Sequence, residues 1–193
     1  SKFLHNGVID DGGGIFTNGS SSVTVIDSTL SGNTCEIGEG GAIFNNDSTL
    51  IVIGCTVSEN FADFRGGGIC NRLGNSTLTN LTVVANSTNG YGAGLVNADG
   101  KVSVTNCTLL GNAAKTEGGG ISTIGSLATM ILNNTIVATN TAPSHCDVVG
   151  SFTNSSAHNL IGDGSGSSGI SNGTNGNLIG TATSPIDPML GPL

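Results

Sequence analysis

The stretch Gly118-Gly119-Gly120-Ile121 is the clearest copy of a short motif that recurs along the chain. The other copies are Gly12-Gly13-Gly14-Ile15, Gly40-Gly41-Ala42-Ile43, Gly66-Gly67-Gly68-Ile69 and Gly92-Ala93-Gly94-Leu95. Starting from Ile15, the closing apolar residue returns after 28, 26, 26 and 26 residues. A fixed period of this size indicates stacked structural repeats, so the motif decides the fold before any local propensity is considered.

The second half of each repeat aligns as well. The matching segments are residues 23–33, 50–60, 76–86, 102–112 and 129–140. Apolar residues alternate within them, as expected for strands with one buried face. Asparagine closes each segment, at Asn33, Asn60, Asn86, Asn112 and Asn140, and a second column follows the glycine motif at Asn45, Asn71 and Asn97. Asn tolerates left-handed backbone angles, and stacked amides can bond one another, so we expect two asparagine ladders.

These patterns predict three short strands in each coil of about 26 residues, one after the glycine motif and two before the closing Asn. Parallel strands need a long connection between them, and a complete coil supplies it. The predicted fold is therefore an all-β, single-stranded, right-handed parallel β-helix.

The regular coils are predicted over residues 1–140. Asn6 lies nine residues before Ile15, as Asn60 lies nine before Ile69, so the chain begins in the middle of a coil. An open end exposes unpaired strand edges, so we expect a preceding part of a longer protein, or another subunit, to cover it.

The remaining residues, 141–193, are predicted to form irregular final coils of the same domain. Residues 148–152 resemble one more first strand, and Asn159-Leu160-Ile161-Gly162 recurs as Asn177-Leu178-Ile179-Gly180. Residues 163–176 are rich in Gly, Ser and Asn and are predicted to be a mobile loop. The proline-rich segment from 185 to 193 is predicted to be extended.

The composition excludes several classes of protein. The net charge is −8 with only 5 Lys and Arg residues, which argues against partners such as nucleic acid or an anionic membrane surface. No apolar run approaches the length needed to cross a bilayer, so we expect no membrane insertion by this segment. The 5 cysteines form no Cys-x-x-Cys pair, and we expect most of them to be small buried side chains.

Two features carry a resemblance to a known family. Repeats such as Gly66-Gly67-Gly68-Ile69-Cys70-Asn71, followed by a strand pair and a closing Gly-Asn, resemble bacterial right-handed β-helix surface proteins with polymorphic outer membrane protein repeats. Residues 158–166 and 186–193 resemble the end of the "choice-of-anchor Q" type of secreted β-helix protein. The resemblance implies a module of a larger exported bacterial protein, extracellular or at the cell surface, and supplies no catalytic residues.

Titratable residues that share a column would lie on one face of the solenoid, where β-helix enzymes place their carboxylates. The best column lies four residues before the apolar anchor and contains Asp11, Glu39, Arg65, Tyr91 and Glu117. Glu39 and Arg65 are predicted to form a surface ion pair worth less than about 1 kcal/mol. Calcium at Asp10, Asp11 and Glu39 is the alternative.

Histidine offers no second site. His5, His145 and His158 are scattered along the chain, and the adjacent His145 and Cys146 would point to opposite sides of a strand.

The favoured function is therefore a structural or adhesive module without catalysis and without a cofactor. A polysaccharide-binding or polysaccharide-degrading β-helix is one alternative, and a self-assembling extracellular fibre subunit is another. The expected partners are other domains of a larger polypeptide or neighbouring subunits at the open coil ends, with carbohydrate as a further candidate.

Overall fold

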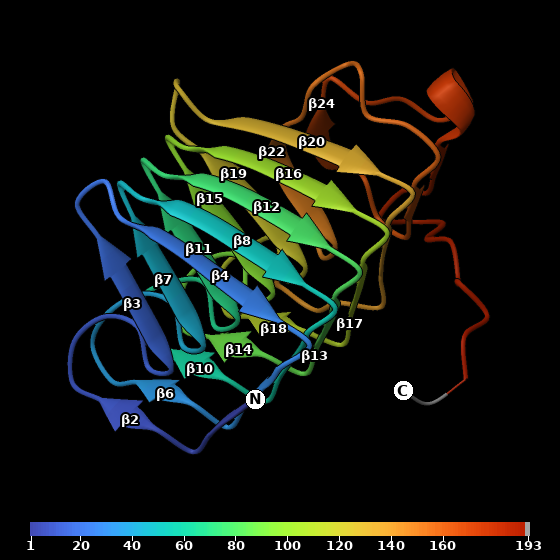
Figure 1. Ribbon diagram of the computed structural model, residues 1–193. Coiled ribbons are helices and arrows are strands. Elements are labelled where there is room, and N and C mark those ends of the chain that lie inside the picture. Colours follow the sequence, from blue (N-terminus) through green and yellow to red (C-terminus); the bar gives the residue numbers. More distant parts are fainter. Residues whose placement is uncertain (192–193) are drawn as a thin grey trace.

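The computed structural model describes residues 1–191, which wind into a solenoid of about 6 turns. The strands of successive coils pair in parallel and build four sheets along the stack. Figure 1 shows the coils side by side, from the blue N-terminal coil to the orange and red C-terminal segments.

Each coil contributes at most one strand to each sheet. The motif sheet, which follows the glycine motif, contains β3 (Ile15–Asn18), β7 (Ile43–Asn46), β11 (Ile69–Arg72), β15 (Leu95–Ala98), β19 (Ile121–Ile124), β22 (Val148–Ser151) and β24 (Gly166–Ser168). The long sheet comes next and contains β4 (Ser22–Ile26), β8 (Thr49–Ile53), β12 (Asn75–Thr79), β16 (Lys101–Thr105) and β20 (Thr129–Asn133).

The other two sheets lie on either side of the closing asparagines. The Asn sheet precedes them and contains β1 (Lys2–Leu4), β5 (Thr29–Ser31), β9 (Thr56–Ser58), β13 (Thr82–Val84), β17 (Thr108–Leu110), β21 (Ile136–Ala138), β23 (Leu160–Ile161) and β25 (Leu178–Ile179). The short sheet follows them and contains β2 (Gly7–Val8), β6 (Thr34–Cys35), β10 (Phe61–Ala62), β14 (Ser87–Thr88) and β18 (Ala113–Ala114).

The predicted register is confirmed. Ile43 pairs with Ile69, which pairs with Leu95, so the apolar anchors stand in one file. The three predicted strands are present in each regular coil, and the two-residue strands of the short sheet are an addition. Two residues are too few to show an alternating pattern, so sequence periodicity could not reveal them.

The C-terminal segments differ in part from their prediction. The expected strand is β22, and the repeated Asn-Leu-Ile-Gly segments pair as β23 and β25. The segment 163–176, predicted to be a mobile loop, instead contains β24, which pairs with β22, and a 3₁₀-helix over Thr174–Gly176. Residues 185–191 contain no strand, and Pro192 and Leu193 of the predicted extended segment lie outside the described residues.

The glycine motif turns a corner at which two coils approach closely. Gly66 has φ of 66°, a left-handed angle that most side chains rarely adopt. A Cβ on the next residue, Gly67, would collide with the carbonyl oxygen of Ser87 in the following coil. The motif is therefore glycine-rich because of both backbone angle and space.

The first asparagine ladder runs along the regular coils, from the exposed Asn6 to the buried Asn140. The backbone N–H and the side-chain Nδ2 of Asn60 both donate to Oδ1 of Asn86, at 3.0 and 2.8 Å. Nδ2 of Asn86 also donates backwards to the carbonyl oxygen of Val57 at 2.9 Å. The same pattern joins Asn6, Asn33, Asn60, Asn86, Asn112 and Asn140. Each buried amide thus links three coils.

The second ladder is shorter. Nδ2 of Asn45 donates to Oδ1 of Asn71 at 2.7 Å, and Asn71 donates to Asn97 at 3.0 Å. Thr17 joins it at one end with a 3.3 Å bond to Asn45. At the other end Nδ2 of Asn97 donates to the backbone carbonyls of Gly100 and Thr129.

The two ends of the core differ. Phe152 and Ile170, 5% and 9% exposed, pack against the core at its C-terminal end. At the other end, Phe3, Ile15 and Val23 are only partly buried, and β1 to β4 each form the outer edge of a sheet. Within residues 1–191, the C-terminal end of the core is therefore covered, and the N-terminal end is not.

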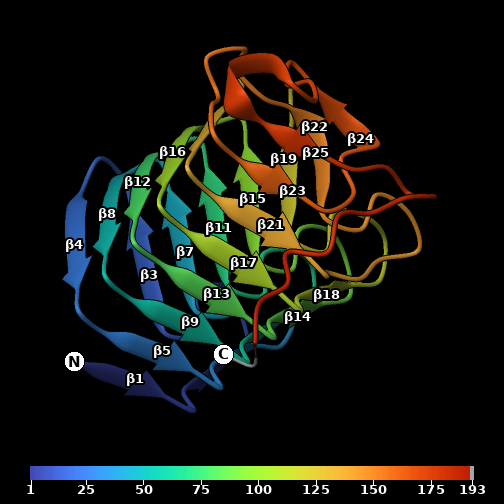
Figure 2. The same ribbon diagram turned by 90° about the vertical axis from the view of Figure 1, so that its right-hand side faces the viewer.

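The C-terminal segment crosses the outside of the Asn sheet (Figure 2). In the early coils the outward position at the end of each Asn-sheet strand is Ser31 or Ser58, whereas in the later coils it is Leu110 or Ala138. Leu110 and Ala138 are buried although they point outward. The column thus becomes apolar beside the segment that contains Pro188 and Leu190.

The ladder can be tested by Asn86→Ala. The change leaves both donors of Asn60 without their acceptor in a buried site, and a buried unsatisfied donor costs about 1–3 kcal/mol. We expect the free energy of unfolding to fall by about 3 kcal/mol or more, measured by urea denaturation. The control Asn75→Ala, at an exposed strand start, should change it by about 0.5 kcal/mol or less. Equal losses in the two variants would contradict a stabilising ladder.

Candidate functional site

The predicted titratable column exists, and part of it is buried. Glu39 bridges in parallel to Arg65, and Arg65 to Tyr91. Nη2 of Arg65 lies 2.8 Å from Oε1 of Glu39, and Nη1 of Arg72 lies 3.9 Å from the same oxygen. Asp11 accepts the backbone N–H of Glu39 at 2.9 Å. Adjacent coils thus bring these residues together.

The predicted ion pair forms, but it is wrong to place it at the surface, because Glu39 is only 5% exposed. Phe44, Cys70 and Val96 point outward from the motif sheet and form a second, smaller apolar cluster outside the main core. The guanidinium of Arg72 lies 5.2 Å from the centre of the Phe44 ring. The loop that carries Glu39 folds against this cluster, so the carboxylate is desolvated.

Arg65 and Cys70, which both contact Glu39, have raised pKa values and therefore stay protonated. Burial is the largest effect and would lower the pKa of Arg65, but the hydrogen bond that Arg65 donates to Glu39 and the nearby negative charge together raise it. Burial, followed by the charge of Glu39, raises the pKa of Cys70 well above its ordinary value. The neutral thiol donates to Oε2 of Glu39 at 3.2 Å. The cluster therefore joins neighbouring coils and holds no thiolate nucleophile.

The buried pair predicts a large effect of Arg65→Met. Removing one partner of a buried pair leaves an uncompensated charge, and we expect the free energy of unfolding to fall by about 3 kcal/mol. Arg72→Met, at a half-exposed side chain with the longer contact, should lower it by about 1 kcal/mol or less. The double variant Glu39→Gln/Arg65→Met should be more stable than Arg65→Met alone, and chemical denaturation of all three checks this. A loss below about 1 kcal/mol for Arg65→Met would restore the surface-pair interpretation.

Two buried acids, Asp147 and Asp163, lie at the C-terminal end of the asparagine ladder, beside a cavity of about 420 Å³. Oδ1 of Asp147 accepts both donors of Asn140, at 2.9 and 2.8 Å, and thus replaces the next asparagine. Oδ2 of Asp147 accepts the backbone N–H of Asp163 at 2.7 Å. Asp163 in turn accepts the backbone N–H groups of Cys146 and Ser165. Both carboxylates therefore terminate backbone and amide hydrogen bonds.

Asp147 and Asp163 do not belong to any of the repeat columns that the sequence displays. A ladder of buried amides that ends at Asn140 needs one more buried acceptor after it. This requirement could have pointed to an acidic or amide residue in the segment that follows Asn140. The residues that meet it belong to coils of irregular length, so column counting could not identify them.

Burial raises the pKa of Asp147, and the charge of Asp163 adds to the effect. Because the folded-state pKa lies above the ordinary value of 3.8, the folded chain binds this proton more tightly than the unfolded chain. The stability from this group is complete below that value and is lost as the pH rises through the raised pKa. In Asp147→Asn, whose amide does not titrate, this decline should vanish. Unfolding curves at several pH values above 3.8 would check this, and parallel pH profiles for the two proteins would contradict it.

The histidines and the cysteine beside His145 do not form a catalytic group. His5, His145 and His158 each occupy a corner with positive φ, in different parts of the stack. Nδ1 of His145 lies 3.4 Å from Oε2 of Glu117, while the thiol of Cys146 donates to the carbonyl oxygen of Ala142. His145 and Cys146 lie in a bend before β22 rather than on a strand, and their side chains contact different groups.

All five cysteines are free, and four are buried as expected. Cys55 and Cys107 stand in one column with Leu81 between them, and the thiols accept the backbone N–H groups of Ser28 and Leu81.

Within residues 1–191, no three side chains of His, Cys, Asp or Glu form a group that could hold a metal ion. Asp11 and Glu39 are joined through a backbone N–H, and Glu39 also contacts Arg65 and Cys70. Calcium at Asp10, Asp11 and Glu39 stays a prediction.

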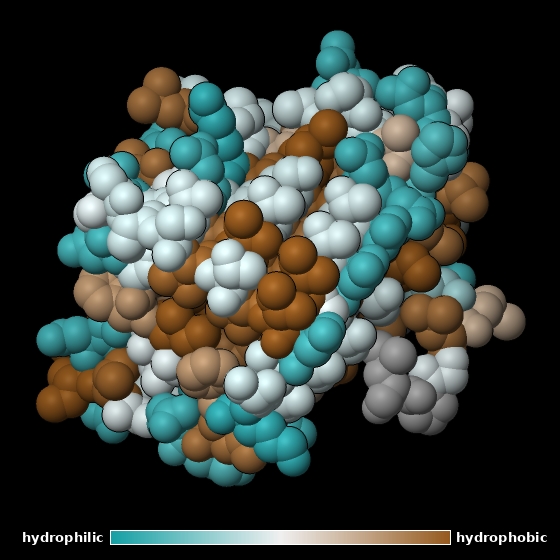
Figure 3. Space-filling model, viewed as in Figure 1, coloured by the Kyte–Doolittle hydropathy of each residue, from teal (hydrophilic) through white to brown (hydrophobic). Residues whose placement is uncertain are grey.

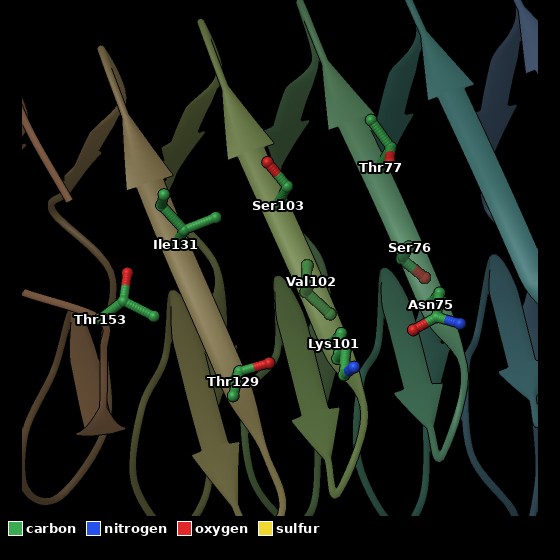
Figure 4. A pocket seen from close by; sticks show the side chains of 9 residues that line it. All are labelled: Asn75, Ser76, Thr77, Lys101, Val102, Ser103, Thr129, Ile131 and Thr153. Carbon is green, nitrogen blue, oxygen red and sulfur yellow. The ribbon is translucent and has the colours of Figure 1, made fainter. Parts of the chain in front are cut away.

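The outer face of the long sheet carries the remaining candidate. Its five strands direct three side chains each to the outside, beginning with the first residue, and of these only Lys101 is charged. Figure 3 shows the face as a band of white and brown, bordered by teal. A trough of about 240 Å³ crosses β12, β16 and β20, between Asn75 and Thr77 at one end and Thr129 and Ile131 at the other (Figure 4).

Among the described residues, no helix has the length and apolar character needed to cross a membrane.

Comparison with known proteins gives one result. A family model described as "Right handed beta helix region" matches residues 2–136. No curated protein and no solved structure matches the chain.

Proposed function

Because the chain belongs to the right-handed β-helix family, we propose that it is a rigid structural and adhesive module of an exported bacterial protein, at the cell surface or outside the cell. The fold itself is consistent with a structural or extracellular module. The bacterial origin, the export and the adhesion are the proposed part.

The observation that carries the proposal is that the buried acids hold neighbouring coils together. Glu39 accepts bonds from Arg65 and Cys70, and Asp147 and Asp163 accept bonds from backbone and amide donors. The oxygens of these acids accept hydrogen bonds from residues of other coils, which supports a role in making the stack of coils rigid. With the asparagine ladders, these contacts make a stiff stack whose outer faces are free to contact a surface.

The proposed partners follow from the two ends. At the N-terminal end, the edge of each sheet presents backbone groups that another parallel coil fits, and Oδ1 of Asn6 lies where such a coil's asparagine would donate. We propose that other domains of a larger polypeptide, or a neighbouring subunit, occupy this edge. A fibre built by head-to-tail stacking would also require Phe152 and Ile170 to leave the opposite end, so the fibre is the weaker alternative.

Polysaccharide binding is the second candidate, and the trough on the long sheet favours it. Its polar side chains come from adjacent coils and face solvent together (Figure 4). Polysaccharide degradation would need an acid and a base near the bound chain, and Lys101 is the one titratable residue that lines the trough.

Two measurements test the main proposal. Antibodies against the purified chain should label intact cells of the source organism, and protease added outside should remove the label. Beads coated with the chain should adhere to a surface that albumin-coated beads do not bind. Labelling only after the cells are broken would overturn export, and release of reducing or unsaturated sugar ends from a polysaccharide would overturn the non-catalytic role.

A further inference from the structure

We propose that the cavity at the C-terminal end of the asparagine ladder binds a small organic cation, in which a primary ammonium group is carried on a short apolar chain. This site is independent of the adhesive function and lies away from the long sheet. Three parts of the chain line the cavity: the loop of residues 139–147, Asp163 after β23, and the segment of residues 182–187.

The size and the walls of the cavity suit a small molecule. Its volume of about 420 Å³ lies within the roughly 300–1,000 Å³ of pockets that hold small ligands. Pro143 on the loop supplies apolar surface, as do Ala182, Pro185 and Ile186 on the C-terminal segment. A short alkyl chain that lies against these walls leaves water, which favours binding.

The charge in this cavity is unbalanced. Asp147 and Asp163 line it and are only 2% and 3% exposed. In the part of the chain that the structure describes, the ion pairs involve other acids. None of the 5 Lys and Arg residues, all within residues 1–191, lines the cavity. Because a buried charge is normally paired, the site lacks a cation.

The buried acid elsewhere in the solenoid shows how this chain pairs such a charge. Glu39 is 5% exposed, and Nη2 of Arg65 lies 2.8 Å from one of its oxygens. The basic group that lines the cavity, His145, has another acid beside it, since its Nδ1 lies 3.4 Å from Glu117. A ligand that supplies the cation would therefore do for Asp163 what Arg65 does for Glu39.

Asp163 has acceptor capacity left for a ligand. One of its oxygens accepts the backbone N–H of Cys146 at 3.2 Å, and the other accepts that of Ser165 at 3.0 Å. A carboxylate offers about four acceptor sites, so about two remain. Asp147 accepts three hydrogen bonds and adds mainly its charge. Burial raises the pKa of Asp147 and the charge of Asp163 adds to this effect, so the two acids repel one another and a cation would relieve the repulsion.

The side chains favour an ammonium group over a metal ion. Within residues 1–191, no three side chains of His, Cys, Asp or Glu form a group that could hold a metal. An ammonium group has three donors and needs acceptors at ordinary hydrogen-bond distances. It can donate to Asp163 while its carbon chain contacts Pro185 and Ile186.

The first test compares three compounds with the same carbon chain: pentylamine, pentanol and pentanoate. At neutral pH they are positively charged, uncharged and negatively charged. We expect pentylamine alone to raise the unfolding midpoint, by about 5 °C at about 100 times its dissociation constant. Equal stabilisation by all three would show that the acids play no part and would overturn the ligand class. No stabilisation by pentylamine would overturn the site.

Two variants locate the site. Asp163→Asn removes a charge from the cavity and should weaken pentylamine binding about 10-fold. Ala182→Leu, at an exposed residue of the lining, narrows the cavity and should also weaken it. The matched control Asp47→Asn makes the same charge change at an exposed corner far from the cavity lining and should bind as wild type. Circular dichroism establishes that each variant folds, and wild-type affinity in a folded Asp163→Asn or Ala182→Leu would overturn the site.

Cys146 provides a readout within the cavity. Four of the five cysteines are buried, whereas Cys146 is partly exposed and lines the cavity. Pentylamine, but not pentanoate, should slow the alkylation of Cys146 by iodoacetamide about 10-fold at about 10 times its dissociation constant, measured by peptide mass mapping. Stabilisation by pentylamine without protection of Cys146 would place the amine elsewhere and overturn the site.

Discussion

The constraint on which the structure depends is that a buried amide must find its hydrogen-bond partners. The inner asparagines of the long ladder, from Asn33 to Asn112, are buried, and the partners of each are the equivalent asparagine of the next coil and a carbonyl of the preceding one. A shift of one coil by one residue would leave several buried donors unpaired and would turn the apolar side chains outward. The coil register is therefore fixed from within.

A fixed register also determines the outer faces. Because each coil lies on its neighbour residue for residue, outward side chains form straight columns as the inward ones do. A single change within such a column, such as the small Ser103 between Thr77 and Ile131, becomes a local feature of the surface. The ladder that holds the core in register therefore also sets the geometry of the trough, and the binding chemistry comes from the residues that stand in those columns.

The buried acids arise where the regular stack meets something irregular. Asp147 lies where the asparagine ladder runs out of asparagines, and its second oxygen accepts the N–H of Asp163 from the shortened coils that follow. Glu39 lies where a corner loop folds onto the outward cluster around Phe44 and Cys70. In both places a buried carboxylate accepts hydrogen bonds from neighbouring segments of the chain. Such an arrangement makes the fold rigid and leaves the carboxylate few free oxygen lone pairs for chemistry.

The sequence by itself determined the period, the three main strands, the inward columns and both asparagine ladders. Each of these depends on contact between residues a fixed number of positions apart, and the repeat displays that number directly. Only the tertiary structure decided that Glu39 is buried and Arg65 partly buried, that Asp147 ends the ladder, that β24 forms within residues 163–176 and that Ser103 lines a trough. These features depend on how loops and irregular C-terminal segments fold against the stack, and contacts of that kind have no fixed spacing that a sequence could reveal.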